Sequence, residues 1–457
     1  MFGFAKKRLK TQNNMSNKNK NTYFGLSTPL GRSATATIRL SGWESKKTLE
    51  KLTAGKLDNP KHRTSYVVDI YNKNNTLIDN VIILYFKGPN SYTGDDLVEI
   101  HSHGNPIIIE QICETLLNLG LRPAEAGEFT RAAYLNNKID LVQAESILSL
   151  INSNTIDGVN LSLNSVSGSL SIKTLEMRKE IIEALGLAEY ELDISETDTH
   201  KQTIKVIKKR INRALLDTTK LISTAKSARI NTLGASVVIY GKPNVGKSTL
   251  FNTLLNYERS IVTDTAGTTR DTVDVASTIG RHSVVLVDTA GIRKTEDIVE
   301  KLGVERTQEK INEADISIQV VTSAPSTKNA NPNNITVLNK IDLLEKKEIN
   351  SVRKNKNVIC VSAKNKTGIP SLLKQINKKL DSKSQCKIET QITSTRQKQR
   401  LKNIQKELEK VLRNKETNLE IIAHHLTCAI KEFDSLLGKT STDDVLDSVF
   451  SSFCVGK

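Results

Sequence analysis

The residues best suited to chemistry lie in a glycine-rich segment, Gly241-Lys-Pro-Asn-Val-Gly246-Lys247-Ser248. The apolar run SVVIY precedes it and the helical pattern STLFNTLL follows it, so the segment joins a strand to a helix. Glycines let the backbone wrap a phosphate closely, and a helix N-terminus offers free N–H groups and a favourable dipole. Lys247 adds a positive charge for the β- and γ-phosphates, and the Ser248 hydroxyl is a suitable Mg²⁺ ligand. The segment predicts a nucleotide-phosphate site.

Three further segments follow in order, each at the end of an apolar run, and they select the base. Asp288-Thr-Ala-Gly291 can hold the magnesium shell through its aspartate and sense the γ-phosphate through its last amide. Asn339-Lys-Ile-Asp342 ends with a carboxylate that can accept both N–H donors of the guanine edge, a pattern that adenine lacks. Ser362-Ala363 is placed to support the same base. Together these segments predict GTP rather than ATP.

A threonine-rich stretch between the first two segments, 263–271, predicts a mobile switch loop. We assign Thr269 to the Mg²⁺ shell. Ile292 stands where Ras-like enzymes place a catalytic Gln, so another group must orient the attacking water. The nearby acids that could do so are Glu296, Asp297 and Glu300. The predicted GTP site comprises Asn244, Val245, Gly246, Lys247, Ser248, Thr249, Thr263, Asp264, Thr265, Ala266, Gly267, Thr268, Thr269, Asp288, Thr289, Ala290, Gly291, Asn339, Lys340, Ile341, Asp342, Ser362 and Ala363.

The pattern of apolar and polar residues along the chain predicts a multidomain protein. Short β-rich runs over 22–137 indicate a small α+β domain, and amphipathic patterns over 138–232 indicate a helical domain. Over 233–381 apolar runs alternate with helical stretches, which is typical of an α/β domain with a parallel sheet. The tail 382–457 is helical again. The economical interpretation is one all-α domain split by an inserted P-loop GTPase domain.

The N-terminal residues 1–21 are basic and polar, and we expect a disordered tail in a cytoplasmic protein. A mitochondrial transit peptide is the alternative, as is an upstream start codon with Met15 as the functional start. The five cysteines are scattered, which favours a reducing compartment over a disulfide framework or a zinc site. His101 and His103 could share one face of a strand, and we favour a polar-network role for them.

The 457-residue chain contains 66 Lys and Arg against 50 Asp and Glu, a formal charge of +16. Such an excess suits nucleic acid. A lysine-rich genome would produce the same excess, so charge alone leaves both interpretations open. No run of eighteen apolar residues exists, and we expect no membrane span.

Taken together, GKPNVGKS, TDTAGTTRD, DTAGIR with Glu300, and the terminal FCVGK resemble the MnmE (TrmE) family of tRNA-modification GTPases. The N-terminal segments STPLGRSATATIRLSG, GPNSYTGDDLVEIHSHGNP and GEFTRAAYLNNKIDLVQAE resemble that family in the same order. The resemblance covers nearly the whole chain after the tail. Its most specific mark is the terminal Cys-x-Gly-Lys, which ordinary GTPases lack.

The resemblance implies roles for particular residues. Asn244, Thr263, Thr265 and Thr268 correspond to the family's K⁺ ligands, and Glu300 to its catalytic glutamate. Arg39, Glu99, Lys138 and Lys457 correspond to positions that contact a formyl-tetrahydrofolate such as 5-formyltetrahydrofolate. Cys454 becomes a candidate catalytic thiol, and its alternative is an ordinary free thiol. Asn105 departs from the family, which commonly has a glycine there.

The resemblance also implies partners. The N-terminal domains would form a homodimer. The chain would act on tRNA with an MnmG (GidA)-type protein that uses FAD and NADH, in a heterotetramer that adds a carboxymethylaminomethyl- or aminomethyl-type group at C5 of the wobble uridine. The alternative is a regulatory GTPase of ribosome assembly resembling Era or EngA, with no covalent chemistry on RNA. Such GTPases lack the N-terminal segments and the CVGK terminus.

Overall fold

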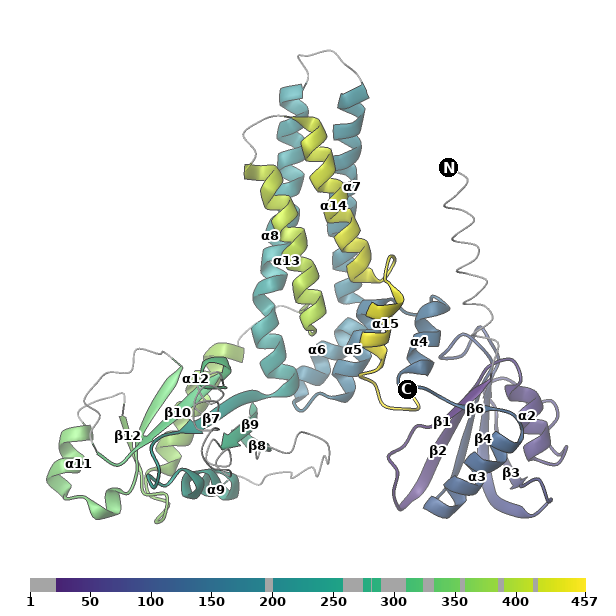
Figure 1. The fold of residues 1–457 in the computed structure, drawn as a ribbon, viewed down its shortest axis with the longest axis horizontal. Helices are drawn as coiled ribbons and strands as arrows, with labels where there is room; N and C mark the ends of the chain where they lie inside the picture. Colours follow the sequence, from purple (N-terminus) through teal and green to yellow (C-terminus); the bar gives the residue numbers. More distant parts are fainter. Residues whose placement is uncertain are drawn as a thin grey trace, which may run out of the picture. The chain divides into compact units, whose positions relative to one another are not determined.

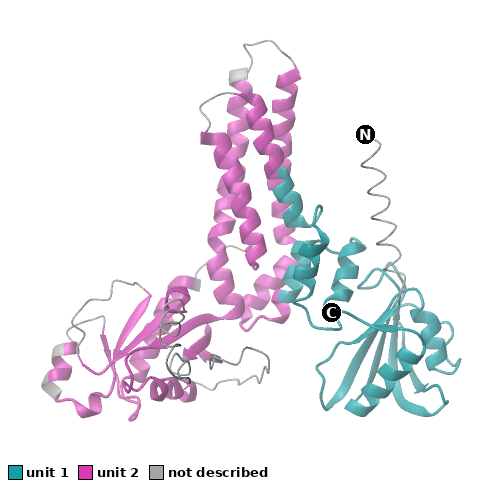
Figure 2. Ribbon diagram, in the orientation of Figure 1, with its two compact units in different colours: residues 1–148, 430–457 teal, residues 149–429 magenta. Residues whose placement is uncertain are grey.

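The computed structural model describes residues 22–193, 200–257, 274–280, 282–288, 310–323, 333–353, 358–384, 390–413 and 418–457. The chain divides into two compact units, residues 1–148 with 430–457 and residues 149–429 (Figure 2). Helices α5 (Leu141–Ile151) and α14 (Leu419–Leu437) each contribute to both units. The boundaries expected at 137/138, 232/233 and 381/382 stay predictions.

The first unit contains a six-stranded sheet in the order β3-β4-β5-β2-β1-β6. Its strands are β1 (Tyr23–Leu26), β2 (Ser33–Ser41), β3 (Ser65–Tyr71), β4 (Leu77–Phe86), β5 (Leu97–Gly104) and β6 (Arg122–Pro123). One face carries alternate apolar side chains such as Ile38, Ile83 and Ile100, which are fully buried. Helices α2 (Ser45–Leu52) and α3 (Pro106–Asn118) add to this core. The expected α+β fold is confirmed.

The C-terminal segment belongs to this first unit. Helix α15 (Asp443–Phe450) contacts α4 (Glu128–Leu135) through Arg131, whose Nη1 lies 2.7 Å from Asp447 Oδ1. After α15, Val455 forms an isolated antiparallel β-bridge with Ala126, outside the strands of the sheet. At Gly456, φ is +94°, and a Cβ would lie 2.2 Å from the Leu26 carbonyl oxygen, so this close approach requires glycine. The chain terminus is therefore held beside β1.

The second unit contains a bundle of long helices, α7 (Ser169–Asp193), α8 (His200–Leu233), α13 (Thr395–Arg413) and the first part of α14, with the short α6 (Ile156–Val166) (Figure 1). Buried residues recur at helical spacing, as in Leu401, Ile404 and Leu408 of α13. These long helices confirm the amphipathic patterns read from the sequence. Among the described helices, none has the length and apolar character needed to cross a bilayer.

An α/β sheet lies in the sequence between α8 and α13, in the order β12-β11-β10-β7-β9-β8. Its strands are β7 (Ala235–Tyr240), β8 (Asp274–Ile279), β9 (His282–Asp288), β10 (Ile316–Val321), β11 (Asn334–Leu338) and β12 (Val358–Cys360), and its helices include α9 (Lys247–Tyr257), α11 (Lys346–Arg353) and α12 (Ile369–Ser384). The expected parallel arrangement is confirmed for five strands. The edge strand β8 is antiparallel and was not expected, because DVASTI lacks the apolar run of a central strand.

Helix α8 is tied to this sheet at Asp315, which is 1% exposed. Its carboxylate accepts a hydrogen bond from the Ser236 amide at 2.9 Å and pairs with the Arg229 guanidinium on α8. Lys383, at the end of α12, donates to the Asp315 backbone carbonyl. Burial, followed by the nearby Lys226 ammonium, lowers the pKa of Lys383 to about 8. This Asp315 joint fixes α8, the sheet and α12 relative to one another.

Candidate nucleotide site

The glycine-rich segment forms the turn between β7 and α9, as its sequence predicts. Gly246 has a φ of +91°, and a Cβ there would lie 2.4 Å from Asn339 Nδ2. A side chain would therefore separate the phosphate loop from the base-reading loop. Lys247 Nζ donates to the Lys242 carbonyl at 3.0 Å, which holds the ammonium over the loop. The Ser248 side chain is exposed in the first turn of α9.

Asn339 joins three loops. Its Nδ2 donates to the Val245 carbonyl at 2.9 Å, and its Oδ1 accepts the Ala363 amide at 3.0 Å. Beside it, Lys340 Nζ donates to the Asn244 carbonyl at 2.7 Å. The phosphate loop, the NKID segment and the segment at 362–363 thus form one hydrogen-bonded unit at the carboxyl edge of the parallel strands, where such sheets bind ligands.

The Asp342 carboxylate is exposed at this edge and suited to reading a base. Ser362 Oγ donates to Asp342 Oδ1 at 2.6 Å. That hydrogen bond is the main cause of a lowered pKa of Asp342, so the side chain is ionised at neutral pH. An ionised carboxylate accepts only, which complements the paired N–H donors of guanine.

Some of the remaining residues of the predicted GTP site are described by the structure, and the others are not. Val245 and Ile341 are buried, whereas Asn244 and Thr249 are exposed. Asp288 is the last residue of β9. Residues 263–269, residues 289–292 and the acids Glu296, Asp297 and Glu300 lie outside the described residues.

A second group of predicted residues meets in the first unit and forms the N-terminal polar cluster of Arg39, Glu99 and Lys457. Arg39 and Glu99 are paired across β2 and β5, with Nε and Oε1 2.8 Å apart. Burial and then the charge of Arg39 lower the pKa of Lys457, so the terminal lysine lies in the field of the guanidinium. The side chains of Arg39 and Glu99 are 24% and 15% exposed, so both charged groups are partly accessible to solvent.

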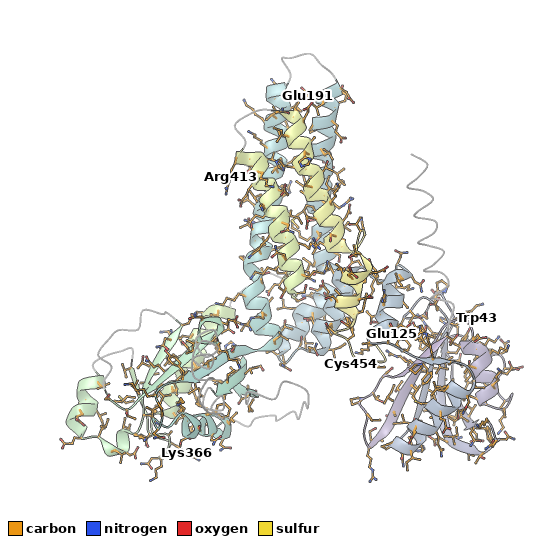
Figure 3. The ribbon with its side chains drawn as sticks, in the orientation of Figure 1. Trp43, Glu125, Glu191, Lys366, Arg413 and Cys454 are labelled. Atoms are coloured by element: carbon orange, nitrogen blue, oxygen red, sulfur yellow. The ribbon has the colours of Figure 1, made fainter. Side chains whose placement is uncertain are left out.

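Lys138 and Cys454 were predicted for the same region. Lys138 Nζ donates to the Pro89 carbonyl at 2.9 Å, and among the described residues it forms no hydrogen bond or ion pair with Arg39 or Glu99. Cys454 has an exposed side chain on the C-terminal segment that also carries Lys457 (Figure 3). Tyr92 was not predicted, and its ring centroid lies 6.0 Å from the Arg39 guanidinium carbon. The segment GPNSYTGDD, which resembles the family, is the signal that could have indicated Tyr92.

The two histidines and Asn105 have local polar roles. His101 Nδ1 lies 3.0 Å from Thr37 Oγ1, and His103 Nδ1 lies 2.8 Å from Asp79 Oδ1. Asn105 is the N-cap of α3 and accepts the Ile107 amide at 2.9 Å. Its departure from glycine therefore has a structural use, because it satisfies a free amide of the helix.

Comparison with known proteins decides the family. The family described as MnmE helical domain matches residues 141–454, and the one described as GTP-binding protein TrmE N-terminus matches residues 22–138. A relative from Pseudothermotoga lettingae is 38% identical over 95% of this chain and 99% of its own. A relative from Flavobacterium johnsoniae is 35% identical over 96% and 100%. Both are named tRNA modification GTPase MnmE. The chain belongs to the MnmE family.

Membership of the MnmE family agrees with a nucleotide site and an N-terminal unit in one chain. Among solved structures, a GTP-binding protein of Sulfolobus solfataricus in complex with GDP aligns with 56% of this chain at 20% identity and a TM-score of 0.24. Because this TM-score is low, the family assignment rests on the sequence relatives and the family models.

Proposed function

We propose that the chain hydrolyses GTP in order to modify tRNA, adding a carboxymethylaminomethyl- or aminomethyl-type group at C5 of the wobble uridine together with an MnmG-type FAD- and NADH-using partner. The observation that supports this most is the presence in one chain of the Asn339-joined nucleotide loops and of a polar cluster that includes the chain's own terminal lysine. A GTPase that only switches a binding surface does not need such a polar cluster.

For the nucleotide site we propose that Asp342 reads the guanine edge and that Lys247 holds the β- and γ-phosphates. The exposed Ser248 hydroxyl fits a Mg²⁺ ligand, with Thr269 as its proposed companion. The exposed Asn244 fits a K⁺ ligand, with oxygens from Thr263, Thr265 and Thr268. When bound, these cations offset charge that develops on the phosphates. Glu300 is the proposed group that orients the attacking water.

For the N-terminal polar cluster we propose a reduced formyl-folate as ligand. The guanidinium of Arg39 and the ammonium of Lys457 suit its carboxylates. The Glu99 carboxylate can accept from ring N–H groups through Oε2, which lies 3.6 Å from His101 Nε2, whereas Oε1 is bonded to Arg39. Lys138 and Cys454 are proposed to act at the same site. We also propose that these N-terminal units pair in a homodimer.

Nucleoside analysis of tRNA from a strain without this gene tests the proposed function. We expect the C5-substituted wobble uridine to be replaced by its unsubstituted form, and a plasmid copy of the gene to restore it. Unchanged modification together with a ribosome-assembly defect would favour the alternative, a regulatory GTPase resembling Era or EngA.

A further inference from the structure

Positive charge is concentrated on two helices that pack against each other, α8 and α13. Their sequences contain sixteen Lys and Arg and only three Asp and Glu. With 66 and 50 in the whole chain, the remainder is close to neutral, 50 against 47. A lysine-rich genome would spread the excess over all segments. Genome composition therefore does not explain the concentration of positive charge on two adjacent helices.

Helical spacing places four lysines on the sides of these helices that meet. Gln405 Nε2 lies 3.4 Å from Thr219 Oγ1 and marks where the two sides meet. On α8, Lys208 lies about three turns before Thr219 and Lys226 about two turns after it, on the same side of the helix. On α13, Lys398 lies about two turns before Gln405 and Lys402 within one turn of it. We name this set the lysine seam: Lys208, Lys226, Lys398 and Lys402.

The lysine seam differs in its pairing from several other basic residues of the bundle. Arg210 pairs with Glu180 and Glu183 of α7 at 2.7 and 2.6 Å. On α13, Lys410 and Arg413 each pair with a glutamate of the same helix. Within the described part of the chain, no seam lysine forms an ion pair. All four are exposed or half-buried, so the seam presents uncompensated positive charge to solvent.

The surroundings strengthen this charge at the base of the bundle. Lys226, Lys379 and Arg229 each lower the pKa of Lys383, whereas Asp315, which pairs with Arg229, raises it. Like charges that lie close together repel, and an anion that binds between them relieves the repulsion. Thr219 and Gln405 add uncharged polar groups along the seam. In Figure 3 the exposed Arg413 marks the far end of α13.

We propose that the lysine seam binds the phosphate backbone of tRNA. This inference rests on the proposed function, which makes tRNA the substrate. Lysines act on phosphates as point charges without reading sequence, which suits an enzyme that must hold several tRNAs by a shared backbone. From Lys208 to Lys226 the seam runs about 27 Å along α8, long enough to follow several phosphates.

The test uses the full-length chain with all four seam lysines replaced by glutamine, K208Q, K226Q, K398Q and K402Q. The matched control makes the same change at four exposed lysines of the first unit, Lys51, Lys61, Lys73 and Lys87. Fluorescence anisotropy with labelled tRNA is recorded over a series of KCl concentrations, and GTPase activity without tRNA is recorded for each variant. Complementation of the deletion strain gives a second readout.

We expect the seam variant to bind tRNA at least about tenfold more weakly near 0.1 M salt, with a log–log salt slope reduced by about 3. Its GTPase activity should match the wild type, and the control should bind tRNA like the wild type. The seam variant should fail to restore wobble modification.

Three results would overturn the proposal. One is a seam variant with wild-type tRNA affinity and salt slope. Another is a seam variant that binds tRNA normally but no longer binds the MnmG-type partner, which would make the seam a protein interface. The third is a wild-type chain that does not bind tRNA at all. In each case, restoration of wobble modification by the wild-type gene would leave the proposed function standing, whereas its failure to do so would remove that function separately.

Discussion

The nucleotide site and the N-terminal polar cluster are built in different ways. At the nucleotide site each function is carried by a short contiguous segment, and the segments are joined by Asn339, which bonds to the Val245 carbonyl and the Ala363 amide. In the polar cluster each segment supplies one side chain. Arg39 and Glu99 meet only because β2 and β5 pair, and Lys457 arrives with the chain terminus.

This difference has a consequence for substitutions. The nucleotide loops depend on backbone conformation and on hydrogen bonds to backbone atoms, so a change in one loop is felt in the others. The polar cluster depends on charged side chains supported by a sheet with its own buried core. Substituting one of its charges should weaken a ligand without disturbing the fold.

The largest expected effect concerns the nucleotide site. Glu300→Ala should leave GTP binding nearly intact but slow hydrolysis about 10²-fold or more, the scale of a lost general base. Hydrolysis should also require K⁺, because Ile292 stands in place of a glutamine and sodium is too small for the proposed oxygen cage. Steady-state rates in KCl and NaCl at matched ionic strength measure both effects.

Glu296→Ala is the matched control for this prediction and should retain activity. Equal rates in the two salts would contradict the potassium mechanism. A fully active Glu300→Ala would move the catalytic role to Glu296 or Asp297.

The second prediction tests the base-reading loop. Asp342→Asn should weaken GTP binding about tenfold to a hundredfold, because an amide cannot accept both guanine N–H donors. The same variant should gain affinity for xanthine nucleotides, whose edge carries an oxygen at that position. Ser362→Ala, which removes the 2.6 Å hydrogen bond to Asp342, should show a smaller loss and no xanthine preference. GTP affinity that is unchanged in Asp342→Asn would show that NKID does not read the base.

The third prediction tests the polar cluster. Arg39→Ala or Glu99→Ala should weaken binding of 5-formyltetrahydrofolate about tenfold, the scale of a charged hydrogen bond, and leave GTPase activity unchanged. Calorimetry on the intact dimer measures the affinity, with Lys51→Ala as the exposed control in the same unit. Absence of folate binding to the wild type would remove this ligand from the account.

The smallest expected effect concerns the Asp315 joint, which links α8 to the sheet of the nucleotide site. The pKa of Lys383 falls from 10.5 to about 8 in the fold, so between these values the unfolded chain retains a proton that the folded chain has released. The free energy of unfolding of the wild type should therefore rise relative to that of Lys383→Gln as pH increases from 8 toward 10.5. Thermal melts of both proteins across this range give the difference, and parallel curves would contradict the assignment.

The contrast between the two regions also explains what the sequence could predict. The nucleotide loops follow from contiguous motifs in the expected strand–loop–helix context, and the structure places GKPNVGKS and NKID at strand ends. The β-rich pattern LVEIHSHG corresponds to β5, Leu97–Gly104. The strand β8 was missed because an edge strand needs no continuous apolar run.

Other features depend on contacts between distant segments and have no local pattern. Arg39 and Glu99 are sixty residues apart in sequence, and only family resemblance indicated that they act together. Tyr92 beside Arg39 and the buried Asp315 were not predicted, because nothing in their sequence neighbourhoods marks a contact with a residue far along the chain.

Complementation of the deletion strain with two variants tests the central claim, that both regions serve one tRNA-modifying enzyme. Lys247→Ala removes the phosphate-binding charge, and Arg39→Ala removes one of the two cations of the polar cluster. Wobble uridine is quantified by nucleoside analysis in each strain at wild-type protein levels. We predict that both variants leave the wobble uridine unmodified, although Lys247→Ala still binds the folate and Arg39→Ala still hydrolyses GTP. Full modification in the strain that carries Lys247→Ala would contradict the account.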